Sequence, residues 1–463
     1  MLPAFTRRPR VAFVAAALVG CVWLNQGPSL RRYDALVQRA RHGGSMALRA
    51  WLPFAFAYRR SADEELYFAT TNAIRGAPFD RGLLIAKRGE TSAAFTRFPA
   101  SDGHWHMPYT EVPLEYPALV LPFILLPALA TRTFGTFAMG FGALMAALLL
   151  AAIALVDRCG TDVDSERAAR WWLAGALFLA QGGLLIQRLD AIPTLFLAVA
   201  FWAAVRRKPL WMGLGVGLAA AAKIAPLVVL FPMMAADRSA WKTPRALALL
   251  GGGLALGLGG GLLPMVLASP AGFANFIAYH VARGLHIEST YGAVLSVIAL
   301  LRGHAEGATL SYGSFNVQGS AASFWAAAST PILAASLATL TAWLCFRPAP
   351  STEAERVESL ACASLAGILC VWLFGKVFSP QYMMWAIPFV LVISARRVAL
   401  SLLCAMAISQ IYLRGFYDQV ADMRALGVFA LAVRLAVLVA LATYVIRAIP
   451  QGKSSGARFE GAP

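Results

Sequence analysis

The sequence predicts an all-α, polytopic membrane protein, a helical bundle of about 12 spans with further helices at its outer surface. Hydrophobic residues make up 59% of the 463 residues, and only 14% are charged. Long apolar runs recur from end to end, as is typical of multi-spanning membrane proteins. The 40 Lys and Arg exceed the 23 Asp and Glu, but they form short clusters between the apolar runs. This interruption excludes a continuous basic face, so we expect no nucleic-acid partner.

The basic clusters predict the topology. Short cytoplasmic loops carry an excess of Lys and Arg, so we place all of these clusters, and both chain termini, in the cytoplasm. The clusters lie at 7–10, 157–170, 206–208, 238–245, 346–358, 396–397 and 447–453.

Twelve apolar segments then fit as spans. Several are shorter than the roughly 20 residues that cross a bilayer, so we expect broken helices shielded by the bundle. We interpret the first as an uncleaved span rather than a signal peptide, because no convincing small-residue cleavage site follows it. The spans are expected at about 11–27, 134–156, 172–188, 190–206, 209–222, 224–236, 244–267, 322–346, 359–375, 383–395, 398–413 and 426–447.

Three further apolar segments lie at 46–58, 114–131 and 290–302. The charge pattern makes them juxtamembrane or re-entrant segments on the outer side. Segment 114–131 is hydrophobic enough to cross, but an ordinary span there would place Arg206–Lys208 outside. The sequence leaves open whether it spans the membrane or re-enters it.

We expect residues 1–450 to form a single integral-membrane domain. Its outer parts are a long first loop, 28–113, and a second segment, 270–321. Residues 451–463 are expected to be a disordered cytoplasmic tail. The glycine run GGGLALGLGGG at 251–261 predicts close helix packing, because a phosphate loop would need a preceding strand and a following Lys-Ser/Thr.

Ionisable residues beside apolar runs are functional candidates, because a charge at the bilayer centre costs about 2.5–3.5 kcal/mol. One group begins in SADEELY, residues 61–67, where three acids stand in a row. Under the predicted topology the candidates all fall at the outer membrane surface. They are Asp63, Glu115, Arg188, Asp190, Lys223, His280, Arg283, Glu288 and Lys376.

Each candidate also has a structural interpretation. Acids favour the first turn of a helix, which would explain Asp63. Arg188 and Asp190 could form an ion pair at a tight turn, and Lys223 could extend to the interface. His280 and His286 lack an HExxH motif, and their spacing of six does not place them on one helix face, so we predict no metal site there.

One carboxylate among several cations, at the outer surface of a bundle in lipid, fits group transfer from a lipid-linked phosphate donor. The carboxylate would take the proton of an acceptor hydroxyl, and the cations would hold the phosphate as it leaves. The main alternative is a transporter or flippase for a lipid-linked sugar, which would be expected to place its charges along a path through the membrane.

At these residues the chain resembles the GT-C superfamily of integral-membrane glycosyltransferases, and most of all glycosyltransferase family 87, the polyprenol-phosphate-mannose-dependent mannosyltransferases. Four stretches between about 60 and 390 carry the resemblance. They are D-x-x-x-Y (Asp63 to Tyr67) followed by NAIRGAPF and EYPALVLPFILLP; QRLDAIPTLFLAVAFWAAVRRKP leading into GLAAAAKIAPLVVLFPM; YHVARGLHIES with SYGSFN; and KVFSPQYMMWAIP.

The resemblance implies an inverting transferase that moves a sugar, mannose by analogy, from a polyprenyl-phosphate donor to a glycan or glycolipid acceptor outside the cell membrane. It implies that Asp63 is the catalytic base, with Glu64 and Glu65 as solvated neighbours. One acid among many cations argues against a dedicated metal site, and no cofactor is expected. The residues expected to bind donor or acceptor are Tyr67, Glu115, Tyr116, Arg188, Asp190, Lys223, His280, Arg283, Glu288, Lys376, Gln381 and Tyr382.

The chain departs from the family pattern in the long first loop. EYPA replaces the usual EYPP, the acidic stretch stands far from the first span, and an insertion at about 81–110 precedes Glu115. The insertion carries His104, Trp105, His106 and Tyr109. It could cover the acceptor site or be an exposed loop without a role.

Overall fold

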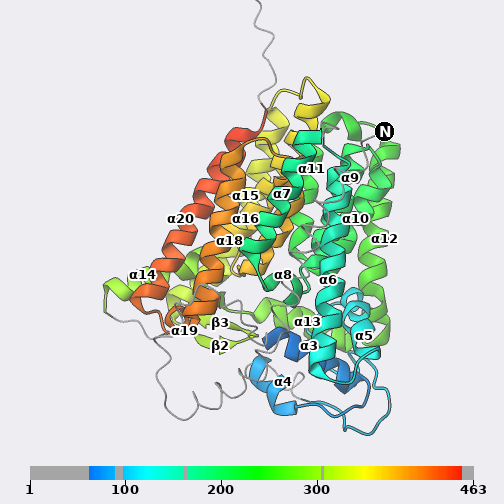
Figure 1. The fold of residues 1–463 in the computed structure, drawn as a ribbon, viewed down its shortest axis with the longest axis vertical. Coiled ribbons are helices and arrows are strands. Elements are labelled where there is room, and N and C mark those ends of the chain that lie inside the picture. The colour runs from blue at the N-terminus through cyan, green and yellow to red at the C-terminus, as the bar shows by residue number, and fades with distance from the viewer. Residues whose placement is uncertain (1–61, 89–96, 161–163, 304–306, 451–463) are drawn as a thin grey trace, which may run out of the picture.

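The computed structural model describes residues 62–88, 97–160, 164–303 and 307–450. The first predicted span, 11–27, the outer segment 46–58 and the tail 451–463 therefore lie outside the described residues. Figure 1 shows long helices side by side along the longest axis, with short helices and small strands gathered at one end. The prediction of an all-α, polytopic helical bundle is confirmed.

Six helices in the described part of the chain are long and apolar enough to cross a membrane. Three of them, beginning after Thr133, Thr243 and Thr352, start where the threonine hydroxyl accepts a hydrogen bond from a backbone N–H of the first turn. The six are α6 (Phe134–Asp157), α12 (Pro244–Ala268), α15 (Ser320–Phe346), α16 (Glu353–Phe374), α18 (Arg396–Gly415) and α20 (Ala425–Ala448).

The shorter predicted spans are short or broken helices inside the bundle, as expected. Predicted span 172–188 is divided between two helices, and the spans predicted at 224–236 and 383–395 each include part or all of a 3₁₀ segment. Most residues of α9 are buried, so its short length is shielded from lipid. These elements are α7 (Asp164–Gln181), α8 (Leu184–Gln187), α9 (Ala191–Val205), α10 (Pro209–Ala222), η3 (Ala225–Val229), α11 (Leu230–Ala236), η4 (Arg238–Trp241), η5 (Pro380–Ala386) and α17 (Ile387–Val390).

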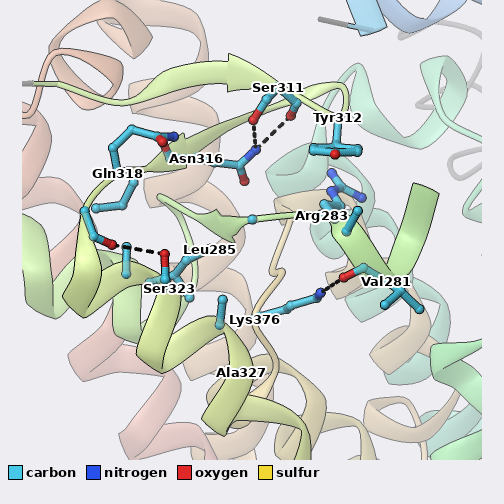
Figure 2. Close-up of a pocket in the computed structure, with 16 residues that line it drawn as sticks. Val281, Arg283, Leu285, Ser311, Tyr312, Asn316, Gln318, Ser323, Ala327 and Lys376 are labelled. Atoms are coloured by element: carbon cyan, nitrogen blue, oxygen red, sulfur yellow. Dashed lines mark hydrogen bonds between the residues drawn. The ribbon is translucent and has the colours of Figure 1, made fainter. Parts of the chain in front are cut away.

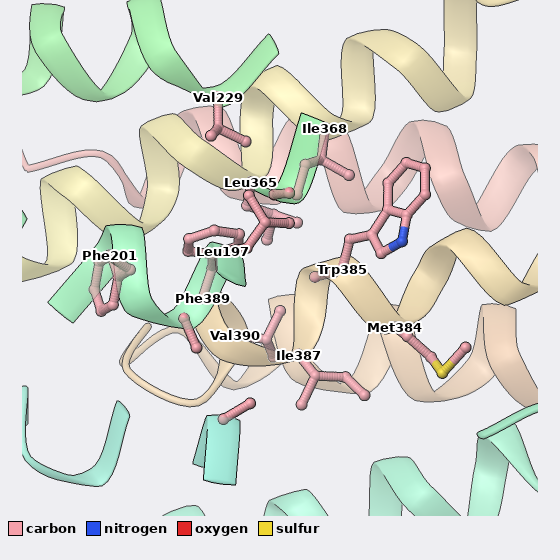
Figure 3. Packing of buried hydrophobic residues seen from close by; sticks show 14 of the residues in the cluster. Leu197, Phe201, Val229, Leu365, Ile368, Met384, Trp385, Ile387, Phe389 and Val390 are labelled. Atoms are coloured by element: carbon pink, nitrogen blue, oxygen red, sulfur yellow. The ribbon is translucent and has the colours of Figure 1, made fainter. Parts of the chain in front are cut away.

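Helix α16 is the centre of the bundle. In its most apolar stretch 89% of the residues are buried, against 17% in α15, which faces outward. Figure 3 shows how Leu365 and Ile368 of α16 meet Leu197 of α9 and Phe389 of α17. Segments far apart in the sequence therefore share one close-packed apolar core.

Glycines bring α10 and α12 into close contact. A Cβ built on Gly253 would lie 2.1 Å from the carbonyl oxygen of Leu210, and one on Gly217 would lie 2.6 Å from that of Leu254. The two backbones thus touch where side chains would separate them. The prediction of close helix packing in the glycine run is confirmed.

Most of the predicted cytoplasmic loops that the structure describes meet at one end of the bundle. The Arg206 guanidinium donates to the carbonyl of Arg158, and Arg238 donates to the carbonyl of Arg347 at 2.8 Å. Arg356 is buried, pairs with Asp237 at 2.7 Å and also donates to the carbonyl of residue 205. These contacts gather five loops or helix ends on one face, which we call the basic end.

The opposite end carries the short elements. The segment 114–131 forms a 3₁₀ turn and a nine-residue helix, too short to cross a membrane. The segment 290–302 is also a short helix. The elements are α3 (Ala62–Ile74), α4 (Arg81–Arg88), η2 (Ala118–Val120), α5 (Leu121–Leu129), α13 (Pro270–Ala282), α14 (Thr290–Leu301), α19 (Tyr417–Ala421), β1 (Leu285–His286), β2 (Thr309–Ser311) and β3 (Ser314–Val317).

The strands form a small antiparallel sheet in the order β1–β3–β2, which the sequence analysis did not predict. Tyr312 and Gly313 make the two-residue turn between β2 and β3, and both have positive φ angles, 51° and 68°. Such turns match the twist of paired strands, and this one presents Tyr312 at the end of the hairpin.

We predict that Gly253→Ala destabilises the bundle by about 1–3 kcal/mol, because its methyl group would meet the backbone of α10. The matched control is Gly252→Ala, where a Cβ would have nothing within 4 Å. That change should be neutral or stabilising, because alanine favours a helix over glycine. Melting temperatures in detergent measure both; equal values for the two variants would contradict the packing argument.

Candidate active site

Helix α3 presents the acidic stretch at the end opposite the basic end. Asp63, Glu64 and Glu65 form its first turn, where the helix dipole stabilises negative charge. Asp63 and Tyr67 lie one turn apart, on the same face. The Asp63 side chain is 28% exposed, whereas Glu64 is 1% exposed. The expectation that Glu64 is solvated is therefore wrong.

Tyr67 and Tyr116 form an aromatic wall beside Asp63. Tyr67 is buried, and its ring centroid lies 5.6 Å from that of Tyr116 and 5.4 Å from that of Phe141. The hydroxyl of Tyr109, which belongs to the insertion, donates to the carbonyl of Tyr116 at 2.7 Å. Glu115, next in the chain, is also buried.

Arg188 forms an ion pair with Asp63. It lies in the short link between α8 and α9, and its side chain is 22% exposed. The sequence analysis considered a pair between Arg188 and Asp190 instead. The chain turn at 188–190 directs these two side chains to different partners. Asp63 and Arg188 therefore place a carboxylate beside a guanidinium at a partly exposed position.

Asp190 is almost fully buried and is held by two residues. Its carboxylate accepts hydrogen bonds from Lys223 Nζ at 2.9 and 3.1 Å and from Trp385 Nε1 at 3.0 Å. Lys223 Nζ also lies 4.2 Å from the ring centroid of Tyr382, which stacks on Trp385. The Lys223 ammonium is therefore fixed over an aromatic surface by Asp190, and its side chain is 30% exposed.

His280 joins α13 to the start of the segment at 114–131. Its Nε2 lies 3.3 Å from the carbonyl oxygen of Glu115. Burial and, to a smaller extent, the nearby charge of Arg283 together lower the pKa of His280 to about 4. The imidazole is neutral near pH 7, so His280 acts as a hydrogen-bonding group rather than a cation.

A pocket of about 440 Å³ lies between the end of α13, the three-stranded sheet and the first turns of α15. Figure 2 shows that Arg283 and Lys376 both line it. Lys376 Nζ donates to the carbonyl of Val281 at 2.8 Å, and Arg283 Nε donates to Ser314 Oγ at 3.3 Å. The described residues that line the pocket include these two cations and no carboxylate.

Asn316, on β3, fixes the sheet side of this pocket. Its side-chain amide donates to the backbone and the hydroxyl oxygen of Ser311 at 2.7 and 2.9 Å. Hydrogen bonds between Asn316 and Ser311 thus fix the polar wall of the pocket, so the wall presents a defined surface to a ligand.

The remaining predicted residues lie differently. Gln381 is half-buried, next to Tyr382 at the start of η5. Glu288 is 4% exposed, and its carboxylate accepts hydrogen bonds from Tyr412 and Arg434, so it presents almost no surface to a substrate. The predicted residues thus fall mainly into two groups: the cluster around Asp63, Arg188, Asp190 and Lys223, and the pocket with Arg283 and Lys376.

The sequence analysis missed Trp385 and Arg434. Trp385 stands in the stretch KVFSPQYMMWAIP without having been singled out, and only the fold brings it to Asp190. Arg434 stood inside the apolar stretch LAVRLAVLV, within a predicted span. A charged residue in such a place marks a buried partner, so this signal was present in the sequence.

The described part of the insertion packs on the end of α3. His106 N donates to the carbonyl of Ile74 at 2.7 Å, and the His106 ring lies 3.1 Å from Asp102. Gly76 has a φ angle of 63°, and a Cβ there would meet the His104 backbone at 2.2 Å. Among the described residues, no group of three His, Cys, Asp or Glu side chains is arranged to hold a metal ion.

A model of glycosyltransferase family 87 matches residues 114–380, more than half of the chain. The chain belongs to glycosyltransferase family 87. No curated protein matches it. Membership makes the protein a glycosyltransferase with sugar donor and acceptor substrates, and it favours this activity over the transporter alternative. The matched region includes Glu115, Arg188, Asp190 and the two pocket cations, and it begins after Asp63.

Proposed function

We propose that this family 87 protein is an inverting transferase that moves a sugar, mannose in the first instance, from a polyprenyl-phosphate donor to a glycan or glycolipid acceptor. The reaction would take place at the outer face of the cell membrane. Residues 1–450 would form one catalytic membrane domain, with Asp63 as the general base and no cofactor.

The observation that carries this proposal is the Asp63–Arg188 pair at the end of the bundle opposite the basic end. The Asp63 side chain is partly exposed, and it stands at a helix start beside a cation. In the reaction the acceptor oxygen would bond to the sugar C1 while the bond from C1 to the phosphate oxygen breaks. The acceptor proton would pass to the Asp63 carboxylate, and the polyprenyl phosphate would leave with the bonding electrons.

The pocket beside α15 supports a lipid phosphate as the leaving group. Burial lowers the pKa of Lys376, and the charge of Arg283 lowers it further. Two cations held close together without a lining carboxylate favour an anion, which would relieve their repulsion. The wall formed by Ala322 and Ala326 belongs to the outward-facing helix α15, along which a lipid chain could lie.

Orientation follows from the division of charge between the two ends. The loops at the basic end carry Arg158, Arg206, Arg238 and Arg347 on one face. The positive-inside rule places that face in the cytoplasm, so the candidate site would face outward. Donor and acceptor would then meet outside the membrane, without a nucleotide.

We expect Asp63→Asn to lower sugar transfer about 10²–10⁴-fold, because the amide cannot accept the acceptor proton. Transfer from labelled polyprenyl-phosphate-mannose in membranes measures this. Glu65→Gln, in the same helix turn, is the control and should transfer sugar at close to the wild-type rate. Near-normal transfer by Asp63→Asn would remove Asp63 as the base.

We expect Lys376→Met to raise the KM for the donor about 10- to 100-fold with little change in kcat, because a charge-assisted hydrogen bond to the phosphate is lost. Arg283→Met should act in the same direction. Arg424→Met is the control: Arg424 is exposed and pairs with Asp422 away from the pocket. An unchanged donor KM in Lys376→Met would contradict a phosphate site in this pocket.

We expect a cysteine at position 101 to react with a membrane-impermeant maleimide in intact cells, because Ser101 is exposed in the outer loop. A cysteine in place of Ser351, exposed at the basic end, should react only after the membrane is permeabilised. Both are made with Cys404, an exposed native thiol, replaced by alanine. The reverse labelling pattern would overturn the proposed orientation.

A further inference from the structure

A buried polar cluster is formed by residues from three separate parts of the chain. Arg434 Nη1 donates to Glu288 Oε1 at 3.1 Å, and Arg434 also donates to the backbone carbonyl of Glu288. The Tyr412 hydroxyl donates to the same carboxylate oxygen. Glu288, Tyr412 and Arg434 are each less than 5% exposed. The cluster thus ties α18 and α20 to the turn that follows β1.

The same arginine also holds the segment that carries Lys376. Its guanidinium carbon lies 4.8 Å from the ring centroid of Phe378, two residues beyond Lys376. The backbone carbonyls of Lys376 and Phe378 both accept hydrogen bonds from His286, the first from its N–H at 3.0 Å and the second from its ring Nδ1. Segment 376–378 therefore lies clamped between β1 and Arg434.

The neutral state of His286 fits this clamp. Burial and, to a smaller extent, the charge of Arg283 together lower its pKa to about 3. The single ring proton is then donated from Nδ1 to the carbonyl of Phe378. Because Glu288 follows His286 by two residues, the ion pair with Arg434 fixes the backbone from which this clamp is made.

Both β1 and the clamped segment 376–378 contribute residues to the pocket lining. Leu285, the other residue of β1, lines the pocket and pairs with Val317 of β3. Arg283 enters the pocket two residues before Leu285, and Lys376 enters from the clamped segment. Both pocket cations thus depend for their position on backbone that the buried cluster holds.

We propose that Glu288, Arg434 and Tyr412 are positioning residues for the donor phosphate: their buried cluster sets Lys376 and Arg283 at the pocket and so determines donor affinity. The inference rests on the proposed function of that pocket. It assigns Glu288 a role through the pocket cations rather than the direct substrate contact that its sequence position suggested.

The cluster could serve only to stabilise the fold, or it could position the pocket cations. Removing both charges together distinguishes these two roles. Loss of one partner of a buried ion pair leaves an uncompensated charge, whereas neutral replacement of both is often tolerated. The test variant is therefore Glu288→Gln with Arg434→Met. The matched control is Asp237→Asn with Arg356→Met, which removes another buried pair, at the basic end.

Initial rates of transfer from labelled polyprenyl-phosphate-mannose give the donor KM and kcat for each purified full-length variant. We expect the Glu288–Arg434 variant to raise the donor KM about tenfold with little change in kcat. The control variant should leave the donor KM unchanged, even if its melting temperature falls. Tyr412→Phe, which keeps the ion pair, should raise the donor KM in the same direction by less.

Lys376→Met added to the Glu288–Arg434 variant decides how the cluster acts. Because the cluster works through Lys376, the combined KM should be close to the larger single effect rather than the product of the two. A multiplicative effect, or an unchanged KM in the folded paired variant, would overturn the positioning role. If the paired variant fails to fold, an unchanged KM in Tyr412→Phe would overturn it.

The two proposals fail in different ways. An unchanged donor KM in Lys376→Met alone contradicts the proposed phosphate site, and the inference falls with it. A raised KM in Lys376→Met, together with an unchanged KM in the cluster variants, contradicts only the inference.

Discussion

A charge inside an apolar bundle is stable only beside a partner, and this constraint organises the whole molecule. Asp190 lies between Lys223 and Trp385, so the link before α9 is joined to α10 and η5. Glu288 and Arg434 join the turn after β1 to α20. At the basic end, Asp237 and Arg356 join α11 to α16. Each pair connects elements that the apolar core alone would hold less specifically.

The two ends of the bundle differ in the structure of their backbone. At the basic end, arginines donate to carbonyls at helix termini and so satisfy groups that the helices leave open. At the other end the helices break, and short helices and a three-stranded sheet take their place. Within a membrane protein, irregular backbone is tolerated where protein surrounds it or a cavity adjoins it, which is where binding groups can converge.

Asp63 is not among the residues that line the pocket. The proposed donor, a lipid-linked sugar, has an anionic phosphate and a neutral sugar, so different residues would bind its two parts. Neutral His280, bonded to the carbonyl of Glu115, connects the elements that carry these two regions. In the proposed reaction the pocket cations would hold the phosphate, and Asp63, outside the pocket lining, would take the acceptor proton.

The sequence by itself determined the membrane bundle, the positions of the long helices and the gathering of the basic loops, because hydropathy and charge act along the chain. It also singled out Asp63, Arg188, Asp190 and Lys223, since charges beside apolar runs are costly. Only the tertiary structure decided the partners: Arg188 pairs with Asp63, and Lys223 with Asp190. Arg434 and Glu288 are 146 residues apart, and β1 pairs with β3 across the whole of α14, so no local pattern records either contact.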